Sequence, residues 1–583
     1  MDPACFWRTI QGDHFILLTG DFRLIITRNK LFYVLILALA LPAYSFSEEV
    51  DKASILRQRL EYLQSNPVSK LNGKSVAAVP FLLELYSRRN FRPTWNNNVH
   101  IEEFISIIEA TVEEGLKPND YHAVTLRNMQ QQVGTGNSRQ DQVDFDILLT
   151  DALFRLGTHL RFGKVDPGRL DSNWNVGREI KTDDPVSIFQ DAIDSDSLKT
   201  FINKRIPRQA FYLRFKQALK KYRAIRDAGG WPVIPDGPVL KPGMRDPRVA
   251  IMRERLSAEG DLVTNVNSSS HLYGDELEQA VIRFQQRHGL EADGVAGQKT
   301  FTAMNISVEN RISQIKANLE RSRWVFTDLT GDFLVVNIAG YKLYLVKNDE
   351  LVWTTNVMVG KTYRKTPVFK SKMKYLVWNP TWTVPPGILR KDIIPKMKKD
   401  PDYLNKKGYL LLDRDGNEVN QATVDFSSLS SRNFPYIVRQ PAGPNNALGQ
   451  VKFIFPNGHF VFLHDTNHRE LFIHSKRAFS SGCIRVENPL KLAELVLENP
   501  EQWDNDGIQK VLSSGKTRTV HLAEPLPVLL LYWTTVVAPD GSVSFYEDVY
   551  GRDQRIIESL DQPFELSADA KRLVVPSIYS SSQ

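Results

Sequence analysis

The sequence predicts a multidomain α+β protein, with a helical N-terminal part followed by a β-rich part. The 583 residues are enough for about three to five domains. From about Val50 to Ala228 apolar residues recur at helical spacing, whereas apolar and polar residues alternate after Gly331. A passage rich in proline and glycine, residues 229–243, interrupts the helical rhythm and is typical of a domain boundary.

Composition narrows the class of protein. With 42% hydrophobic and 24% charged residues, most of the chain should fold. A net charge of +7 is too small by itself to indicate nucleic-acid binding. The two cysteines, Cys5 and Cys483, provide neither a disulfide framework nor a clustered thiolate metal site.

The first 47 residues have the order of an export signal. Arg28 and Lys30 precede the apolar run LFYVLILALAL at residues 31–41, and small residues and an acidic pair follow it. The run is shorter than the roughly 20 residues that span a bilayer. We therefore expect a cleaved signal peptide at residues 1–47, with a retained signal anchor as the alternative. Cleavage would leave Cys483 as the one thiol.

Residues 48–235 are predicted to form a helical scaffold domain. Within residues 81–86 apolar side chains stand at positions i, i+1, i+4 and i+5, which places them on one helix face. Residues 149–160 repeat the pattern, and Gly163 is suited to end that helix. These faces are core stripes, so no site is expected on them.

Residues 236–308 are predicted to form a small unit of three helices. Asp246 and Pro247 suit a helix start, and the turn at residues 293–297 precedes a third short helix. The segment AVIRFQQRHGLEADGVAGQKTFTAMN, residues 280–305, resembles the small peptidoglycan-binding domain of bacterial cell-wall enzymes. This resemblance implies affinity for wall sugar or stem peptide without chemistry, and a generic helical spacer is the alternative.

A β-rich domain is predicted from the alternation in FLVVNIAGYKLYLVKNDELVWTTNVMVG, residues 333–360. Between Lys361 and Lys399 there are eleven lysines and arginines and one acid, Asp392. Aromatic residues lie among these cations, so a nucleic-acid groove is one interpretation. An anionic wall polymer and a merely solvated basic face are the others. Several prolines in this stretch indicate an irregular insertion.

The residues that indicate chemistry lie within 451–489. Cys483 follows Ser480-Ser481-Gly482, whose small side chains leave the sulfur accessible and let backbone N–H groups converge as an oxyanion hole. Arg477 and Arg485 are expected to lower the pKa of the thiol, because nearby positive charge favours the thiolate. His464, at the end of an apolar strand-like run, is the candidate general base.

Two other chemistries fit this segment less well. A zinc site would combine His464, His468 and Cys483, but the intervening Asp465-Thr466-Asn467 is turn-forming and the glutamate of the metalloprotease helix motif is absent. A serine nucleophile would need Gly-x-Ser-x-Gly or Ser-x-x-Lys, and neither occurs in this segment. No metal and no cofactor are expected.

These residues resemble the signature of the bacterial L,D-transpeptidases, in which a histidine and a long spacer precede Ser-His-Gly-Cys, an apolar residue, and Asn or Arg. Here the pieces are His464 and SSGCIR at residues 480–485, with Ser481 in place of the usual histidine. This departure matches the large periplasmic branch of the family. NPTWTVPPGI, KDPDYL and GPNNALGQVKF, at 379–388, 399–404 and 443–453, are similar to that branch, whereas Phe462 and Asn467 depart from it.

The resemblance implies a catalytic domain at residues 309–535, a capping insertion at about 381–447 and a C-terminal tail at 536–583. Cys483 would attack the amide between the L centre of diaminopimelate and the terminal D-Ala of a tetrapeptide stem. His464 would move the proton, and the amine of a second stem would release a 3→3 cross-link. Backbone N–H groups of Ser481 and Gly482 would form the oxyanion hole. Arg485 would orient a substrate carboxylate or the loop, and the other expected substrate-binding residues are Trp382, Phe462, Asp465, Thr466, Arg477 and Ser480.

The resemblance also implies partners and a location. Peptidoglycan stem peptides are the expected partners, cell-wall synthases are candidate partners, and no nucleic acid is expected. The location would be the periplasm, with membrane association only if the N-terminal segment stays uncleaved. Carbapenems would acylate Cys483. Water or a lipoprotein lysine as acceptor, giving a carboxypeptidase or a protein-anchoring enzyme, and a non-catalytic wall-binding scaffold remain alternatives.

Overall fold

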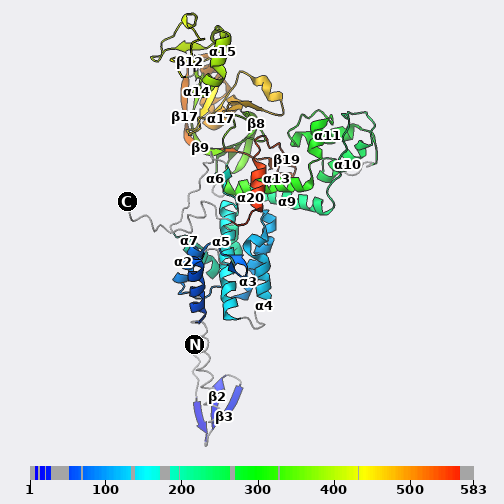
Figure 1. Ribbon diagram of the computed structural model, residues 1–583, viewed down its shortest axis with the longest axis vertical. Helices are drawn as coiled ribbons and strands as arrows, with labels where there is room; N and C mark the ends of the chain where they lie inside the picture. The colour runs from blue at the N-terminus through cyan, green and yellow to red at the C-terminus, as the bar shows by residue number, and fades with distance from the viewer. Residues whose placement is uncertain are drawn as a thin grey trace.

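The computed structural model describes residues 7–10, 14–19, 22–27, 51–66, 70–132, 138–170, 184–195, 197–262, 269–325, 329–430 and 432–564. The prediction of a multidomain α+β fold is confirmed (Figure 1). The apolar run predicted as a signal, residues 31–41, lies outside the described residues, as does the end of the predicted tail beyond residue 564. Among the described residues, no helix combines the length and apolarity needed to cross a membrane.

The N-terminal lobe is built around one long helix. This helix, α5 (Arg139–Phe162), is buried along most of its length. Its polar residues are bonded internally: Asp151 accepts hydrogen bonds from His122 and from Arg155. The surrounding helices are α2 (Val79–Arg88), α3 (Asn98–Glu109), α4 (Ala123–Gln132), α7 (Pro185–Asp194) and α8 (Leu198–Asn203).

Two helices join the lobes at the centre of the molecule. Helix α9 (Ala210–Asp227) packs along α13 (Val308–Val325), and strand β19 (Val543–Phe545) completes their apolar core. Helix α20 (Asp553–Asp561) lies against α13 as well. The central position of α9, α13 and α20 is visible in Figure 1.

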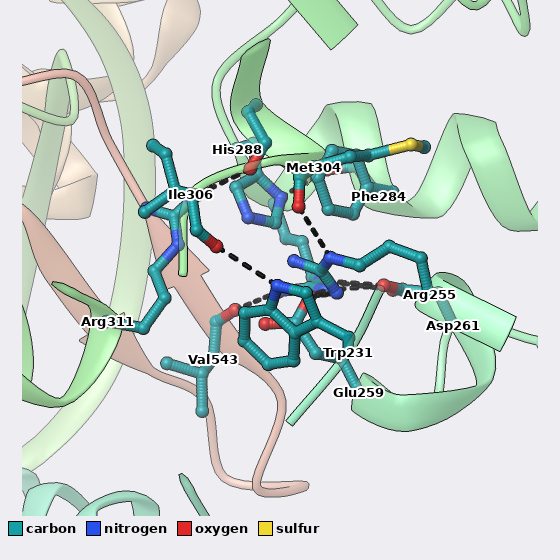
Figure 2. A network of polar contacts seen from close by, with 12 residues as sticks. Trp231, Arg255, Glu259, Asp261, Phe284, His288, Met304, Ile306, Arg311 and Val543 are labelled. Carbon is teal, nitrogen blue, oxygen red and sulfur yellow. Dashed lines mark hydrogen bonds and ion pairs between the residues drawn. The ribbon is translucent and has the colours of Figure 1, made fainter. Parts of the chain in front are cut away.

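The small helical lobe consists of α10 (Arg248–Glu259), α11 (Asp275–Arg287) and α12 (Gln298–Met304) around its own core. Glu259 accepts hydrogen bonds from Arg255 at 2.8 Å and from Tyr222 of α9 at 2.6 Å, and it pairs with Arg287. Arg287 also donates to the carbonyl oxygen of Val543 in β19. This buried network, seen in Figure 2, fixes the lobe to the centre of the molecule.

The β-rich domain is a closed barrel. Its strands follow the order β8-β16-β14-β13-β9-β17-β6-β7, and β7 pairs again with β8, so the ring closes; β15 (Ala478–Ser480) adds beside β8. The ring strands are β6 (Phe333–Asn337), β7 (Lys342–Lys347), β8 (Glu350–Gly360), β9 (Phe369–Trp378), β13 (Val451–Ile454), β14 (Leu463–His464), β16 (Ile484–Val486) and β17 (Arg518–Leu531).

An insertion between β9 and β13 forms a separate small unit, here called the cap (residues 382–440). Its sheet has the order β10-β12-β11, and it has a hydrophobic core of its own. Figure 1 shows the cap at the end of the molecule remote from α2 to α5. Its elements are β10 (Trp382–Thr383), α14 (Pro386–Ile388), α15 (Ile394–Lys399), α16 (Tyr403–Lys406), β11 (Leu410–Leu412) and β12 (Ile437–Gln440).

Candidate active site

Cys483 and His464 line one cavity between the barrel and the cap. Strands β14 and β16 are parallel neighbours, with His464 opposite Arg485, and the amide of Ile484 donates to the carbonyl of Phe462. This register sets Cys483, which immediately precedes β16, beside the strand that carries His464. The cavity has a volume of about 840 Å³ and is walled on its other side by cap residues such as Trp382.

The tautomer of His464 follows from its one ring hydrogen bond. Nδ1 lies 2.5 Å from the carbonyl oxygen of Asp465. Because a carbonyl oxygen can only accept, Nδ1 carries the proton and Nε2 keeps a free lone pair. The imidazole is thus held in the tautomer that a general base requires.

His464 is neutral over the physiological range. Burial, together with the positive charge of Arg485, lowers the pKa of His464 to about 3, although the bond to the Asp465 carbonyl acts in the opposite direction. Lys452, which pairs with His464 across β13 and β14, adds to the lowering. A ring that stays neutral is available to take a proton at any pH well above 3.

The pKa of the Cys483 thiol differs from the sequence prediction. Burial raises the pKa of Cys483, and neither a backbone hydrogen bond with Phe462 nor the charge of Arg485 reverses this. The expectation that positive charge would lower the thiol pKa is therefore wrong in its net sign, because desolvation outweighs the charge. Cys483 therefore rests as a neutral thiol, and His464 rests as a neutral imidazole.

Arg477 lies elsewhere than the sequence predicts. Its guanidinium donates to the carbonyl oxygens of His474, Tyr341 and Val357, and to the side chain of Asn356. These partners belong to the β7–β8 side of the barrel, and Arg477 is not among the residues that line the cavity. The role expected for Arg477 in thiolate stabilisation and substrate binding is thus replaced by a structural one.

The backbone beside the sulfur offers two free donors. In the described part of the chain, no acceptor is paired with the amide N–H of Ser481 or of Cys483. The amide of Gly482, by contrast, donates to Ser480 Oγ at 3.0 Å, so its predicted place in the oxyanion hole is corrected. Gly482 instead supplies the turn, because its φ of +124° is a conformation that other residues rarely adopt. The amides of Ser481 and Cys483 are therefore the two that remain free to donate beside the sulfur.

A chain of hydrogen bonds supports this turn. Ser480 Oγ donates to the carbonyl oxygen of Cys483, and Thr366 Oγ1 donates to that of Gly482 at 2.9 Å. Thr366 Oγ1 also accepts from the amide of Gly360. Thr366 is fully buried, so these bonds are shielded from water. Because the carbonyl oxygens of the turn accept these hydrogen bonds, its free amides are the polar groups left beside the sulfur.

The remaining predicted substrate contacts divide into two groups. Trp382, Phe462 and Ser480 line the cavity with Cys483. Asp465 and Thr466 do not line it, and both side chains are buried. Asp465 accepts from Arg469 and from the amide of Gln450, whereas Thr466 accepts from the amide of His468. These two residues hold the turn after β14, because their polar groups are engaged there.

The cavity is lined by positive charge. No acid occurs among its described lining residues. Its lysines and arginines come from the barrel, the cap and the segment after β8: Arg364, Arg390, Lys391, Lys452 and Arg485. The backbone of Arg485 pairs within the sheet, whereas its guanidinium makes no hydrogen bond or ion pair with any described residue. A cation without a protein partner in a cavity is suited to bind a substrate carboxylate.

Two residues of the cavity were missed by sequence reasoning. Arg364 donates to Asp392 of the cap at 2.5 Å and to Ser481 Oγ at 2.8 Å, so it bridges the cap and the nucleophile turn. In the sequence it is one of many cations, and no motif distinguishes it. Phe460 has a φ of 55°, is 87% exposed, and its carbonyl lies 3.8 Å from Cys483 Sγ. In the sequence Phe460 opens the apolar run of residues 460–463, and no motif in that run indicates its backbone conformation.

The zinc alternative finds no support in the described geometry. His468 is bonded to Glu470 and is absent from the cavity lining. Within the ranges that the structure describes, no three residues of the types His, Cys, Asp and Glu gather as metal ligands.

Three family models match the chain in the order of its lobes. A scaffold domain matches residues 80–219, a putative peptidoglycan-binding domain matches residues 245–304, and an L,D-transpeptidase catalytic domain matches residues 331–517. The first corresponds to the lobe around α5, the second to α10–α12, and the third to the barrel with its cap.

Among curated proteins, a putative L,D-transpeptidase of Haemophilus influenzae is 39% identical over 251 residues, which are 43% of this chain and 50% of that protein. The N-acetylmuramoyl-L-alanine amidase CwlM of Mycobacterium tuberculosis is 38% identical over 76 residues, 12% of this chain and 19% of that one. A solved L,D-transpeptidase from Xylanimonas cellulosilytica, with 16% identity, covers 51% of this chain and 99% of its own, but its TM-score of 0.16 carries no weight for the fold.

The barrel, its cap and the cavity define an L,D-transpeptidase catalytic domain. In addition to this catalytic domain, the chain carries a scaffold domain and a peptidoglycan-binding domain. Its match spans half the length of the Haemophilus protein.

Proposed function

We propose that this protein is a peptidoglycan L,D-transpeptidase that forms 3→3 cross-links through a thioester on Cys483. The observation that carries the proposal is the shared cavity, in which a neutral His464 with a free Nε2 and the thiol of Cys483 face a space lined by cations. The peptidoglycan-binding domain supports the same substrate class.

In the first half-reaction, His464 Nε2 takes the proton of the thiol as the sulfur attacks the carbonyl between the L centre of diaminopimelate and the terminal D-Ala. The amides of Ser481 and Cys483 donate to the oxyanion of the tetrahedral intermediate. The C–N bond then breaks, and His464 returns the proton to the D-Ala amine. The donor stem remains on Cys483 as a thioester.

In the second half-reaction, the side-chain amine of another stem attacks the thioester carbonyl. His464 takes a proton from this amine, and the same two amides hold the second oxyanion. When the C–S bond breaks, the sulfur leaves and is reprotonated by His464. The new amide joins two diaminopimelate residues, and the enzyme returns to its neutral resting pair.

The positive charge of the cavity supports such a substrate. Wall stems bear carboxylates, and the cavity presents Arg485 without a partner beside the reacting atoms and Lys391 and Arg390 on the cap. The basic stretch at residues 361–399 therefore contributes to a site for anionic peptides. Because wall peptides are outside the cytoplasm, we propose an extracytoplasmic location, and carbapenems are the inhibitors that this thioester chemistry would accept.

Product analysis tests the proposal. Purified protein is incubated with a defined disaccharide-tetrapeptide, and products are identified by mass and fragmentation. We expect dimers joined between two diaminopimelate residues, free D-Ala, and neither product with Cys483→Ala. A tripeptide monomer as the one product would show that water is the acceptor, and attachment to an added lipoprotein lysine in place of dimers would show protein anchoring. Either outcome contradicts cross-linking.

A further inference from the structure

A second cavity lies behind the segment that follows β8. Residues 361–368 contribute Arg364 to the active-site cavity and Lys365 to this other one. The second cavity has a volume of about 320 Å³, which is within the usual range for small ligands. Its walls come from α13, the end of β17, α20 and the short helix α6 (Pro167–Leu170) of the N-terminal lobe.

Positive charge is concentrated in this cavity. Arg321, Lys365, Arg552 and Arg555 line it, and no acid is found among its described lining residues. Arg321 is 5% exposed and pairs through Nη1 with Asp553 at 2.5 Å. Its Nη2 is buried and has no hydrogen-bond partner in the structure. A buried guanidinium donor without an acceptor is costly, and an anionic ligand would satisfy it.

Aromatic rings lie next to these cations. The rings of Tyr532 and Tyr550 are stacked with centroids 5.5 Å apart, and the guanidinium of Arg321 lies 5.3 Å from the centroid of Tyr532. Flat apolar surface next to cations suits a ligand that has an aliphatic part and a carboxylate. Peptide units of the kind found in wall stems combine these two features.

The aromatic wall is connected to the nucleophile. Tyr550 donates from its hydroxyl to the carbonyl of Gly360 at 2.6 Å and accepts from the amide of Thr366 at 3.2 Å. Thr366 in turn donates to the carbonyl of Gly482, next to Cys483. A ligand on Tyr550 would therefore lie against the segment that supports the nucleophile turn.

We propose that this cavity is a second binding site for a carboxylate-bearing wall peptide, distinct from the cavity that contains Cys483. The choice of a wall peptide rests on the proposed function, whereas the preference for a carboxylate rests on the cations alone. Arg321 Nη2 and the rim cations Lys365 and Arg555 hold the carboxylates, and the aliphatic chain lies on the two tyrosine rings.

The test uses the stem tripeptide L-Ala-γ-D-Glu-diaminopimelate and its carboxamide analogue as probes. Binding is measured by calorimetry on the full-length chain in an Arg485→Gln background, which weakens the active-site cavity. We expect the tripeptide to give a binding event that the carboxamide does not give, and the rim variants distinguish this event from binding to the peptidoglycan-binding domain. Adding Lys365→Gln and Arg555→Gln should weaken that event by about tenfold or more, because two charge-assisted contacts are lost. Lys491→Gln, at an exposed lysine of helix α17 (Pro489–Leu497), is the matched control.

Arg321→Lys provides a second variant, since it keeps a charge beside Asp553 but removes the free Nη2. This variant should also weaken binding of the tripeptide by about tenfold. The proposal is overturned if the Arg485→Gln protein binds no tripeptide, if the carboxamide binds equally well, or if the rim variants leave the affinity unchanged. Retained binding in a protein that forms no cross-links would overturn the proposed function and leave this site standing.

Discussion

The ring of His464 is oriented by the backbone carbonyl of Asp465, the next residue in the chain. In this site a turn performs the orienting role that a carboxylate side chain has in other nucleophile–histidine pairs. The side chain of Asp465 supports the arrangement indirectly, because it accepts from Arg469 and from the amide of Gln450 and so fixes the turn. The short segment Leu463 to Asp465 therefore carries the imidazole, sets its tautomer and ends strand β14.

The pH dependence of acylation follows from the neutral ring. Burial lowers the pKa of His464 to about 3, so the base form persists as the pH falls from 7 to 5. We expect the rate of acylation by a carbapenem to change by less than about threefold over this range, whereas a histidine of ordinary pKa would lose about twentyfold. Stopped-flow or quenched mass measurements across pH provide the test. A fall centred near pH 6.5 would show that the ring titrates normally.

Direct alkylation of the thiol should be slow. Because burial raises the pKa of Cys483, less thiolate is present at pH 8 than in a free cysteine. We expect iodoacetamide to react with Cys483 at least about threefold more slowly than with glutathione at this pH, and the rate should still be rising above pH 9. Labelling is followed by intact mass, with Cys483→Ala as the blank. A rate that levels off below pH 7 would indicate a preformed ion pair.

The bridge from the cap to the nucleophile turn should affect substrate binding. Arg364 contacts Asp392 and Ser481 at once, and Arg364→Lys cannot reproduce both bonds. We expect Arg364→Lys and Asp392→Asn each to raise KM for the tetrapeptide about fivefold to tenfold, with a smaller effect on kcat. Lys406→Gln, at an exposed cap residue paired with Asp400, is the control. Equal losses in all three variants would remove any special role for the bridge.

The hydroxyl of Thr366 should be needed for the nucleophile turn. Thr366→Val leaves the buried carbonyl of Gly482 and the amide of Gly360 without this partner. We expect about 1–3 kcal/mol lower stability and at least about tenfold slower acylation. Thr366→Ser keeps the hydroxyl and should retain acylation within about threefold. Acylation by the valine variant at the rate of the wild type would contradict this role for Thr366.

The network in Figure 2 should control attachment of the peptidoglycan-binding domain. Burial alone would raise the pKa of Glu259, but the charges of Arg287 and Arg255 outweigh it and hold the pKa well below its usual range. Glu259→Gln leaves two buried guanidinium groups without their anion, so we expect a loss of about 3–5 kcal/mol in the urea transition of this lobe. Because the native pKa is depressed, the stabilisation is present at neutral pH and is lost as the pH falls below the ordinary range of a glutamate.

The control for this network is Glu254→Gln, at an exposed position of the same helix, α10. It should leave the transition within about 0.5 kcal/mol of the wild type. Equal stabilities for the two variants would show that Glu259 does not secure the lobe.

Sequence reasoning predicted the strands and the two reactive groups but not the residues that surround them. The alternation at residues 333–360 predicted β6 to β8, and the context of Cys483 and His464 predicted a pair that the parallel strands β14 and β16 bring to one cavity. Closure of the barrel between β7 and β8 depends on pairings between distant segments, which no local pattern encodes.

The errors have a common physical origin. Arg477 is six residues from Cys483, yet β15 turns its guanidinium to carbonyls on the β7–β8 side. Its proximity along the chain therefore led to an overestimate of its effect on the pKa of the thiol. Desolvation, which raises the pKa of Cys483, depends on the residues that cover the sulfur in the folded chain. Arg364 and Glu259 were missed for the same reason, because their partners come from segments that only the folded chain brings together.

Intact-mass measurement after incubation with a carbapenem tests the central claim most directly. The wild type, Cys483→Ala and His464→Gln are compared at pH 7. We predict one covalent adduct on the wild type, none on Cys483→Ala, and formation at least about a hundredfold slower on His464→Gln, since the base is lost. An adduct on Cys483→Ala, or equal rates for the wild type and His464→Gln, would contradict the assignment of nucleophile and base.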